Sequence, residues 1–585
     1  MARIPLSTIE QERSVMTQAN VRKDYSYGDI PESLKNASNT ITAGRQIAKV
    51  LKKEGVDTLF TLCGGHIVTV HEGCVAEGIR VIDVRDEAAA IDAAQGYAFA
   101  TGKPGVAAVT AGPGVTNAAS GVATAFMAGT PVMLIGGRAP MALFDKSPLQ
   151  DIDQVSLMRP ITKFARTIHT PARAGEYAGM AFREMFAGRP GPVFLDLPLD
   201  LTFHNVPNES VTAYDHYRAT ELAPANPHVV RQAIEMLSKA ERPVIFAGNG
   251  VFWGQAHAEL QRFVETAKIP LFHQGQARGC VPDDHELVFG TNFGLALRDA
   301  DVMLTVGVSF DWLANFGEFG PNLKVIEIDN DRRWIGHNRP AHLGLLGDPK
   351  LVLEQLSDAF PKRSEPLPWV ATMRSRFQKY RRRLDAISEL KGQQNGYMHP
   401  IRVPKEVTEF LDRDATLILD GGDIAGYTNY YAQGYLPGRT VFSCGPLGNL
   451  GQGLPIAVAT KAARPGSQVA LITGDGAFGF HAMEFDTAVR HNLPFVCVVA
   501  NDGGWGNIRW AWKKRHPDGF SVGVDLPFTH YEKIAEAMGG YGELVEDPAD
   551  LKPALARAFR SGKPACINVL TDRQPGTSPY DNFDE

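Results

Sequence analysis

Short apolar runs alternate with longer amphipathic stretches along most of the chain. Four runs in the first 200 residues, at 57–62, 79–84, 106–110 and 131–135, have the length of buried strands. The stretch 88–100, between the second and the third run, is predicted to be a helix. Strands that alternate with helices in this way predict a parallel sheet with helices on both faces.

The same alternation returns twice, after a segment with several prolines near residue 200 and again near Pro400. The chain is therefore predicted to be an α/β protein with three doubly wound parallel-sheet domains. Further strands are predicted at 243–247, 302–306, 325–328, 416–419, 468–473 and 495–500. The predicted units are an N-terminal extension (1–38), a first domain (39–200), a central domain (226–361), a third domain (396–570) and a C-terminal tail or lid (571–585).

The composition narrows the class of protein. The 585 residues are 44% hydrophobic and 21% charged, which is ordinary for a globular protein. The net charge of -6 argues against nucleic acid or an anionic membrane as a partner, because both favour a basic face. No apolar stretch approaches about 18 residues, so no membrane span is predicted. The N-terminus lacks a signal pattern and the six cysteines form no CxxC pair, so we expect reduced thiols and a cytoplasmic location.

A pair of strands in the third domain carries the most informative pattern. The strand at 468–473 leads into residues 474–479, a helix is predicted at about 483–491, and the next strand leads to Asp502. Residues 474–479 fit GxGxxG, which suggests a dinucleotide fold and a nicotinamide dehydrogenase. Two features disfavour the dinucleotide fold. Asp475 would face a pyrophosphate with no cation between them, and no acidic residue ends a second strand in the ribose-binding position.

A divalent cation accounts for both aspartates. Asp475 ends one strand, and Asp502, 27 residues later, ends the next. Because neighbouring parallel strands end side by side, both carboxylates are expected in one crevice. Magnesium prefers carboxylate, carbonyl, phosphate and water oxygens, so we predict Asp475, Asp502 and the backbone carbonyl of Gly504 as its ligands. The glycines nearby let backbone N–H groups approach a diphosphate.

GDG, followed at this distance by an Asn/Asp-rich strand end, resembles the motif of thiamine-diphosphate-dependent enzymes. The family usually has two asparagines there, whereas this chain has Asn501 and Asp502. The resemblance covers about residues 40–570. It implies a pyrimidine-binding, a central and a diphosphate-binding domain, in that order, with thiamine diphosphate and Mg²⁺ as cofactors. It also implies cofactor contacts from Gly474, Gly476, Ala477, Trp505 and Gly506.

Glu87 is the predicted activating acid. In the family, a glutamate at a strand end of the first domain contacts the cofactor pyrimidine and promotes removal of the thiazolium C2 proton. Residues 81–87 supply that strand end and lead into the predicted helix. The acetolactate-synthase branch usually has a histidine directly before this glutamate, where this chain has Asp86. The alternative role for Glu87 is a helix N-terminal charge that complements the helix dipole.

Two further stretches match the family. Residues 448–455 resemble the loop whose large apolar side chain, here Leu450, props the cofactor into a V shape. Residues 420–423 resemble the strand end that meets the diphosphate from the other side. The other cofactor contacts predicted in the first and third domains are Gly65, Gly422, Asp423, Gly448 and Leu450.

The end of the first strand bears on the reaction. Residues 63–67 (CGGHI) are similar to the benzaldehyde-lyase pattern, in which a histidine handles the substrate hydroxyl; acetolactate synthases usually lack it. His66 is suited to proton transfer near neutral pH, and a loop histidine bonded to backbone is the alternative. Gln150 is expected to add a substrate or cofactor contact. We therefore predict Glu87, His66 and Gln150 as catalytic residues.

The central domain is predicted to bind a nucleotide. Residues 276–285 are similar to a stretch of the oxalyl-CoA decarboxylase and 2-hydroxyacyl-CoA lyase branch, where this domain can hold ADP; in acetolactate synthase the region holds FAD. The predicted contacts are Arg278, Asp329 and Asp348. The segment 510–515 is predicted either to offer rings and charge to CoA phosphates or to be an exposed basic loop.

Taken together, the resemblances favour a carbon–carbon lyase or carboligase that cleaves 2-hydroxyacyl-CoA to formyl-CoA and an aldehyde or ketone. The alternatives are acetolactate synthase-like condensation of 2-oxo acids, the more remote NAD-dependent dehydrogenase, and a catalytically silent nucleotide-binding member, which the intact Glu87 disfavours. The expected substrate is a small acyl-CoA or a 2-oxo or 2-hydroxy carbonyl compound. The family site lies between the first domain of one subunit and the third domain of another, so a homodimer or homotetramer is expected.

Overall fold

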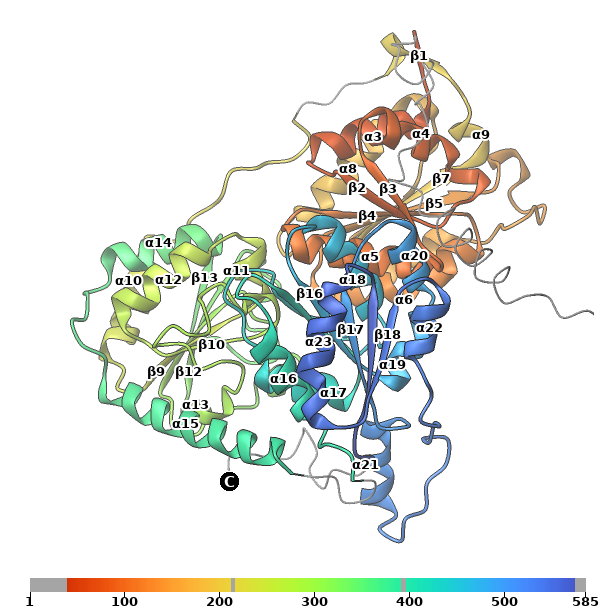
Figure 1. Cartoon of the computed structure of the whole chain (residues 1–585). Coiled ribbons are helices and arrows are strands. Elements are labelled where there is room, and N and C mark those ends of the chain that lie inside the picture. Colours follow the sequence, from red (N-terminus) through yellow and green to blue (C-terminus); the bar gives the residue numbers. More distant parts are fainter. Residues whose placement is uncertain (1–38, 212–215, 391–395, 574–585) are drawn as a thin grey trace, which may run out of the picture.

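The computed structural model describes residues 39–211, 216–390 and 396–573 (Figure 1). In these ranges the chain forms three α/β domains, each built on a parallel sheet. The predicted fold class is therefore confirmed. The predicted N-terminal extension lies outside the described residues, and so does the predicted tail beyond residue 573.

The first domain holds a six-stranded sheet in the order β3-β2-β4-β5-β7-β6. Successive residues of β4 alternate between two cores: Val106 and Ala108 pack on the side of α3, α4 and α8, and Ala107 and Val109 on the side of α5 and α6. The four predicted strands overlap β2 to β5, whereas β6 and β7 have no counterpart in the prediction. The elements are β2 (Thr58–Thr61), β3 (Arg80–Asp83), β4 (Gly105–Val109), β5 (Val132–Arg138), β6 (Phe164–Thr167), β7 (Val193–Pro198), α3 (Ala43–Lys53), α4 (Val68–Ala76), α5 (Glu87–Thr101), α6 (Pro113–Ala128) and α8 (Ala174–Phe186).

The third domain has a six-stranded sheet in the order β15-β14-β16-β17-β19-β18, which repeats the topology of the first domain. β16 and β17 lie side by side with Gly474 opposite Ala500, so their carboxyl ends meet at one edge. The elements are β14 (Thr416–Leu419), β15 (Thr440–Phe442), β16 (Val469–Gly474), β17 (Val496–Asn501), β18 (Tyr541–Val545), β19 (Ala565–Leu570), α16 (Arg402–Phe410), α17 (Asp423–Tyr431), α18 (Gly453–Ala463), α19 (Asp475–His481), α20 (Glu484–Arg490), α21 (Gly506–Arg515), α22 (Glu532–Ala537) and α23 (Leu551–Arg560).

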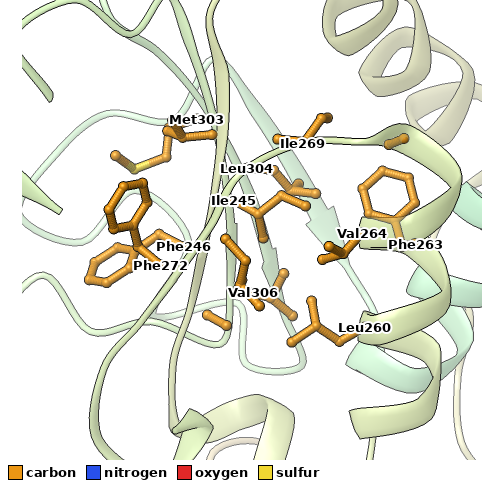
Figure 2. Close-up of a cluster of buried hydrophobic side chains, with 14 of the residues drawn as sticks. Ile245, Phe246, Leu260, Phe263, Val264, Ile269, Phe272, Met303, Leu304 and Val306 are labelled. Atoms are coloured by element: carbon orange, nitrogen blue, oxygen red, sulfur yellow. The ribbon is translucent and has the colours of Figure 1, made fainter. Parts of the chain in front are cut away.

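The central domain has a five-stranded sheet in the order β10-β9-β11-β12-β13. Figure 2 shows the alternation of its side chains: Phe246 and Met303 lie on one side of the strands, and Ile245 and Leu304 face α12 on the other. Apolar burial on both faces explains why these strands are almost wholly hydrophobic. The elements are β9 (Pro243–Ala247), β10 (Leu271–His273), β11 (Val302–Val306), β12 (Lys324–Asp329), β13 (Leu343–Leu346), α10 (Pro227–Lys239), α11 (Asn249–Trp253), α12 (His257–Ala267) and α14 (Pro349–Ala359).

Helices α5 and α18 pack against each other and join the first domain to the third (Figure 1). The two backbones approach so closely that a side chain at Gly96 would collide with the backbone of Ile456. Within the interface, the Gln452 amide donates a hydrogen bond to the buried carboxylate of Asp92. The relative placement of the two domains is therefore fixed by a helix pair with small residues at its centre.

A long helix, α15 (Pro368–Ser388), runs along the central domain toward the third (Figure 1). Arg376 pairs with Asp299 in the central domain, and Arg381 donates to the carbonyl of Tyr430 in the third domain at 2.9 Å. α15 thus connects the two domains through its arginines. Within the ranges that the structure describes, no helix combines the length and the apolar character that a membrane crossing requires.

Candidate active site

Glu87 lies at the carboxyl edge of the first sheet, where the chain passes from β3 into α5. It is the first residue of α5, and only 8% of it is exposed. The side-chain amide of Asn117, on α6, donates a hydrogen bond to Glu87 Oε2 at 3.0 Å. The carboxylate is thus buried and held in one orientation. Asn117 was missed by the sequence prediction, although an amide side chain in a helix of small residues is a signal that could have identified it.

His66 lies in a short 3₁₀ turn, Gly65–Ile67, just after β2. Its Nδ1 is 3.1 Å from the hydroxyl of Thr110, and that hydroxyl donates to Gln150 Oε1 at 3.4 Å. Burial lowers the pKa of His66, so the imidazole is neutral near pH 7 and can accept a proton. A side chain at Gly137 would collide with His66, which explains the glycine there.

The structure brings the three predicted catalytic residues together. A Cβ placed on Gly114 would lie 3.0 Å from the methyl group of Thr110 and 3.6 Å from Glu87 Oε1, so both border the same space. Thr110 in turn contacts His66 and Gln150. Gln150 has φ of 61°, an uncommon conformation for a residue other than glycine. Such backbone strain concentrates at functional sites.

Asp475 and Asp502 face each other at the carboxyl edge of the third sheet. Asp475 is the first residue of α19, and its Oδ2 accepts a hydrogen bond from the Gly504 N–H at 2.9 Å. Burial and the nearby Asp502 raise the pKa of Asp475. Burial also raises the pKa of Asp502, although Arg509, 3.0 Å from its Oδ2, opposes the shift. The buried carboxylate of Asp475 and the partly buried carboxylate of Asp502 repel each other and form a site that a divalent cation would stabilise.

These residues fit a cation bound together with a diphosphate. Among the described residues, no three Asp, Glu, His or Cys side chains form a complete metal site, so phosphate and water would have to supply the remaining ligands. Asp423 is the first residue of α17 and lies close to Asp502, and its buried Oδ1 has no hydrogen-bond partner. Burial, and to a smaller extent repulsion from the Asp502 carboxylate, raises the pKa of Asp423 to about 7. Any side chain at Gly506 would press on Asp502 and Asp423, which keeps this crevice open.

The glycine-rich segment after β16 differs from the prediction. Residues 474–479 were expected to precede a single helix at about 483–491; instead α19 begins directly at Asp475, and α20 covers Glu484–Arg490. The indole of Trp505 packs against Gly476, where a Cβ would lie 2.9 Å from the ring. Gly504 donates its N–H to Asp475, and its carbonyl stays a predicted metal ligand. The glycines therefore permit close packing inside a helix as well as a turn.

Asp420 organises the loop that carries Leu450. Its buried carboxylate accepts hydrogen bonds from the backbone N–H groups of Gly421, Gly451 and Gly453 at 2.8, 3.2 and 3.1 Å. Leu450 is half-buried between these contacts and Gly448, which has φ of 73°. Gly422 is the N-cap of α17, on the other side of Asp420. The Asp420 carboxylate thus holds together both segments that were predicted to meet the cofactor from this side.

A cavity of about 900 Å³ lies between the first and central domains. Its lining includes Asp329 and Asp348 together with Arg189 and Trp334, which stack at 4.0 Å. Burial raises the pKa of Asp329 to about 6. Arg278 is not in the lining itself, but its guanidinium donates to the backbone carbonyl of Asn429 at 2.9 Å and to the Thr291 hydroxyl at 3.3 Å, and both of these residues line the cavity.

Family models match all three domains. A thiamine pyrophosphate enzyme N-terminal TPP binding domain matches residues 41–157. The central domain of thiamine pyrophosphate enzymes matches 230–356, and the C-terminal TPP binding domain matches 420–569. The first match contains Glu87 and His66, and the third contains Asp475 and Asp502.

The chain is also similar to whole proteins. Over 552 residues it is 42% identical to acetolactate synthase large subunit IlvG of Mycobacterium tuberculosis, covering 92% of this chain and 96% of that protein. It is 32% identical over 575 residues to human 2-hydroxyacyl-CoA lyase 2, covering 91% and 90%. With human 2-hydroxyacyl-CoA lyase 1 the identity is 28% over 553 residues, covering 91% and 95%.

Proposed function

Because the chain belongs to the thiamine pyrophosphate enzyme family, we propose that it is a carbon–carbon lyase that uses thiamine diphosphate and Mg²⁺ to cleave 2-hydroxyacyl-CoA esters. The products are formyl-CoA and an aldehyde or ketone. The observation that carries the choice of reaction is the cluster of His66, Thr110 and Gln150 beside Glu87. The human relatives named 2-hydroxyacyl-CoA lyase support it.

The neutral His66 suits the bond-breaking step. As the bond between the carbonyl and the hydroxyl-bearing carbon breaks, the hydroxyl must lose its proton to become the new carbonyl group. His66 is the group proposed to accept that proton. The carbonyl carbon gains one proton as it leaves as a formyl group, so the substrate equals the sum of the products.

The remaining residues of the site are proposed to hold and orient Mg²⁺ and thiamine diphosphate. Asp475 and Asp502 would bind Mg²⁺ and, through it, the diphosphate, while Leu450 would support the cofactor rings. Glu87, fixed by Asn117, would contact the pyrimidine. Bound thiamine diphosphate supplies a nucleophilic carbon and an electron sink. α21, which follows Asp502, exposes Lys513, Lys514 and Arg515, and these cations suit the phosphates of CoA.

A second candidate is condensation of 2-oxo acids, as the name of the relative with 42% identity suggests. The two reactions are separable in one experiment. Protein loaded with thiamine diphosphate and Mg²⁺ is incubated with a 2-hydroxyacyl-CoA or with pyruvate, and products are identified by mass spectrometry. Formyl-CoA supports the lyase. If pyruvate yields carbon dioxide and a 2-hydroxy-2-methyl-3-oxo acid and no formyl-CoA is formed, the proposed lyase reaction is wrong and the condensation reaction takes its place.

We propose that the cavity between the first and central domains binds ADP, with FAD as the ligand if the synthase reaction is found. Asp329→Asn is expected to weaken ADP binding by about 10- to 100-fold, because a hydrogen bond to a charged group contributes about 1.5–3 kcal/mol. Titration calorimetry measures the affinity. Asp358→Asn, which removes an exposed carboxylate of the same domain, is the control. Unchanged ADP affinity in Asp329→Asn would contradict the proposal that this cavity binds ADP.

We also propose a homodimer or homotetramer with each site shared between subunits. Apolar side chains on the rim of the candidate site support this assembly: Phe480 is 58% exposed, Met483 50% and Leu149 82%. Sedimentation of the holoenzyme tests it. A monomer with full activity would contradict a shared site.

A further inference from the structure

The residue before Glu87 decides where α5 begins. Asp86 is the N-cap: its backbone is extended, and its Oδ1 accepts a hydrogen bond from the Ala88 N–H at 2.8 Å. An N-cap fixes the first turn of a helix and the direction in which its side chains leave the backbone. Glu87 is the first helical residue, so its orientation depends on Asp86.

His481 contacts this cap from the third domain. Its Nε2 lies 3.8 Å from Asp86 Oδ1, an ion-pair separation, and its Nδ1 lies 2.9 Å from the carbonyl oxygen of Gly451. A carbonyl only accepts hydrogen bonds, so Nδ1 must carry a proton, and Nε2 faces a carboxylate. The ring is largely buried, with 11% of the side chain exposed. The geometry therefore favours a doubly protonated imidazolium.

The groups that face His481 are acidic or are hydrogen-bond acceptors. They are Asp86 at the N-cap of α5, Asp92 on α5, Glu484 on α20 and the carbonyl of Gly451. Burial alone would lower the pKa of His481, but these groups raise it to about 9. His481 in turn is the main cause of the lowered pKa of Asp86. The two side chains form a charged pair at neutral pH.

Helix α19 connects this pair to the candidate cation site. Asp475 is its first residue and His481 its last, so about 10 Å of helix separates them. Gly451, which binds the other ring nitrogen, directly follows Leu450. His481 therefore contacts both the segment that orients Glu87 and the segment that carries Leu450.

We propose that His481 and Asp86 form a positioning pair, which holds the start of α5 so that Glu87 meets the cofactor pyrimidine in a fixed orientation. The inference rests on the proposed use of thiamine diphosphate, and it is independent of the acyl substrate. It gives a role to Asp86, the position where this chain departs from the pattern of the acetolactate-synthase branch.

Two variants and a matched control test the pair. His481→Gln removes the charge and keeps a hydrogen-bond donor, and Asp86→Asn keeps a capping oxygen and removes the charge. The control is His491→Gln: His491 is buried and pairs with Asp83 at 2.8 Å across the same domain interface, three residues before the cap residue of α5. A general loosening of the interface would affect all three variants alike.

The first readout uses the protein without cofactor. Amide hydrogen exchange at residues 87–90 is expected to accelerate in His481→Gln and Asp86→Asn and to stay at the wild-type rate in His491→Gln.

The second readout uses protein with thiamine diphosphate and Mg²⁺ bound. Exchange of the thiazolium C2 proton with D₂O is expected to slow by about 10- to 100-fold in the two variants. This is the size of effect that follows when a residue that orients a functional side chain is removed. Cofactor Kd, from tryptophan fluorescence, is expected to change by less than about threefold.

The dependence on pH gives a third readout. The pKa of His481 is raised, so the charged pair persists below about pH 9 and is lost as the pH rises through that value. The advantage of wild type over His481→Gln in C2 exchange should disappear over the same range. Wild-type exchange in both variants, or an equal loss in His491→Gln, would overturn the positioning role. Absence of cofactor binding in the wild type would instead overturn the proposed function, and amide exchange would still decide whether the pair holds α5.

Discussion

Glu87→Gln is expected to lower kcat by about 10²- to 10⁴-fold, or about 2.7–5.4 kcal/mol in activation free energy. The amide has the size of the carboxylate and retains an oxygen for the hydrogen bond from Asn117, so the fold should be unchanged. What it loses is the charge that activates the cofactor. Steady-state turnover of the substrate identified by product analysis measures the effect, with cofactor Kd measured alongside.

The matched control is Glu72→Gln, an exposed glutamate on α4 of the same domain. It should retain wild-type kcat. Since the interaction of Glu87 with the pyrimidine matters mainly after binding, the cofactor Kd of Glu87→Gln should stay within about tenfold of wild type. Turnover near the wild-type rate in Glu87→Gln would overturn both the catalytic assignment and the mechanism.

Asp475→Asn is expected to change the apo and the loaded protein in opposite directions. The folded-state pKa of Asp475 is raised above its usual value of 3.8, so ionising this carboxylate costs stability as the pH rises above that value. A neutral amide removes this cost, and apo Tm at pH 7 should rise. The amide is also a poor ligand for Mg²⁺, so thiamine diphosphate should bind at least about 100-fold more weakly.

Thermal unfolding with and without cofactor measures both effects. At about 100 times the wild-type Kd, bound cofactor should stabilise the wild type by about 2.7 kcal/mol and the variant by less than about 0.5 kcal/mol. Asp518→Asn, at an exposed position after α21, is the control and should show the full cofactor shift. A full cofactor shift in Asp475→Asn would exclude Asp475 as a cation ligand.

The parts of the site that follow from strand ends could be predicted from the sequence. β16 and β17 are neighbours in a parallel sheet, so two aspartates that end them must meet. The same reasoning brings the segment before α5 close to the turn that carries His66, because β2 and β3 are also neighbours. Both contacts could be predicted because the period of apolar residues identifies each strand and the glycines mark where it ends.

Contacts between distant segments could not be predicted in this way. His481 reaches Asp86 from another domain, and neither residue has a sequence pattern that names the other. The onset of α19 at Asp475 was missed because two glycines in seven residues disfavour a helix, and tertiary packing overrides that propensity. The contact of the Arg278 guanidinium with a backbone carbonyl of the third domain, 151 residues away, likewise had no signal in the sequence.

The packing of α5 against α18 also determines when the chain can complete its assembly during synthesis. Asp92 bonds to Gln452, which lies 360 residues further along the chain. At about 5–20 residues per second, roughly 20–70 s pass between the synthesis of the two helices. Throughout that interval the nascent first domain exposes the alanine-rich face of α5 that α18 later covers. Folding yield should therefore depend on whether chaperones protect this face until α18 has been made.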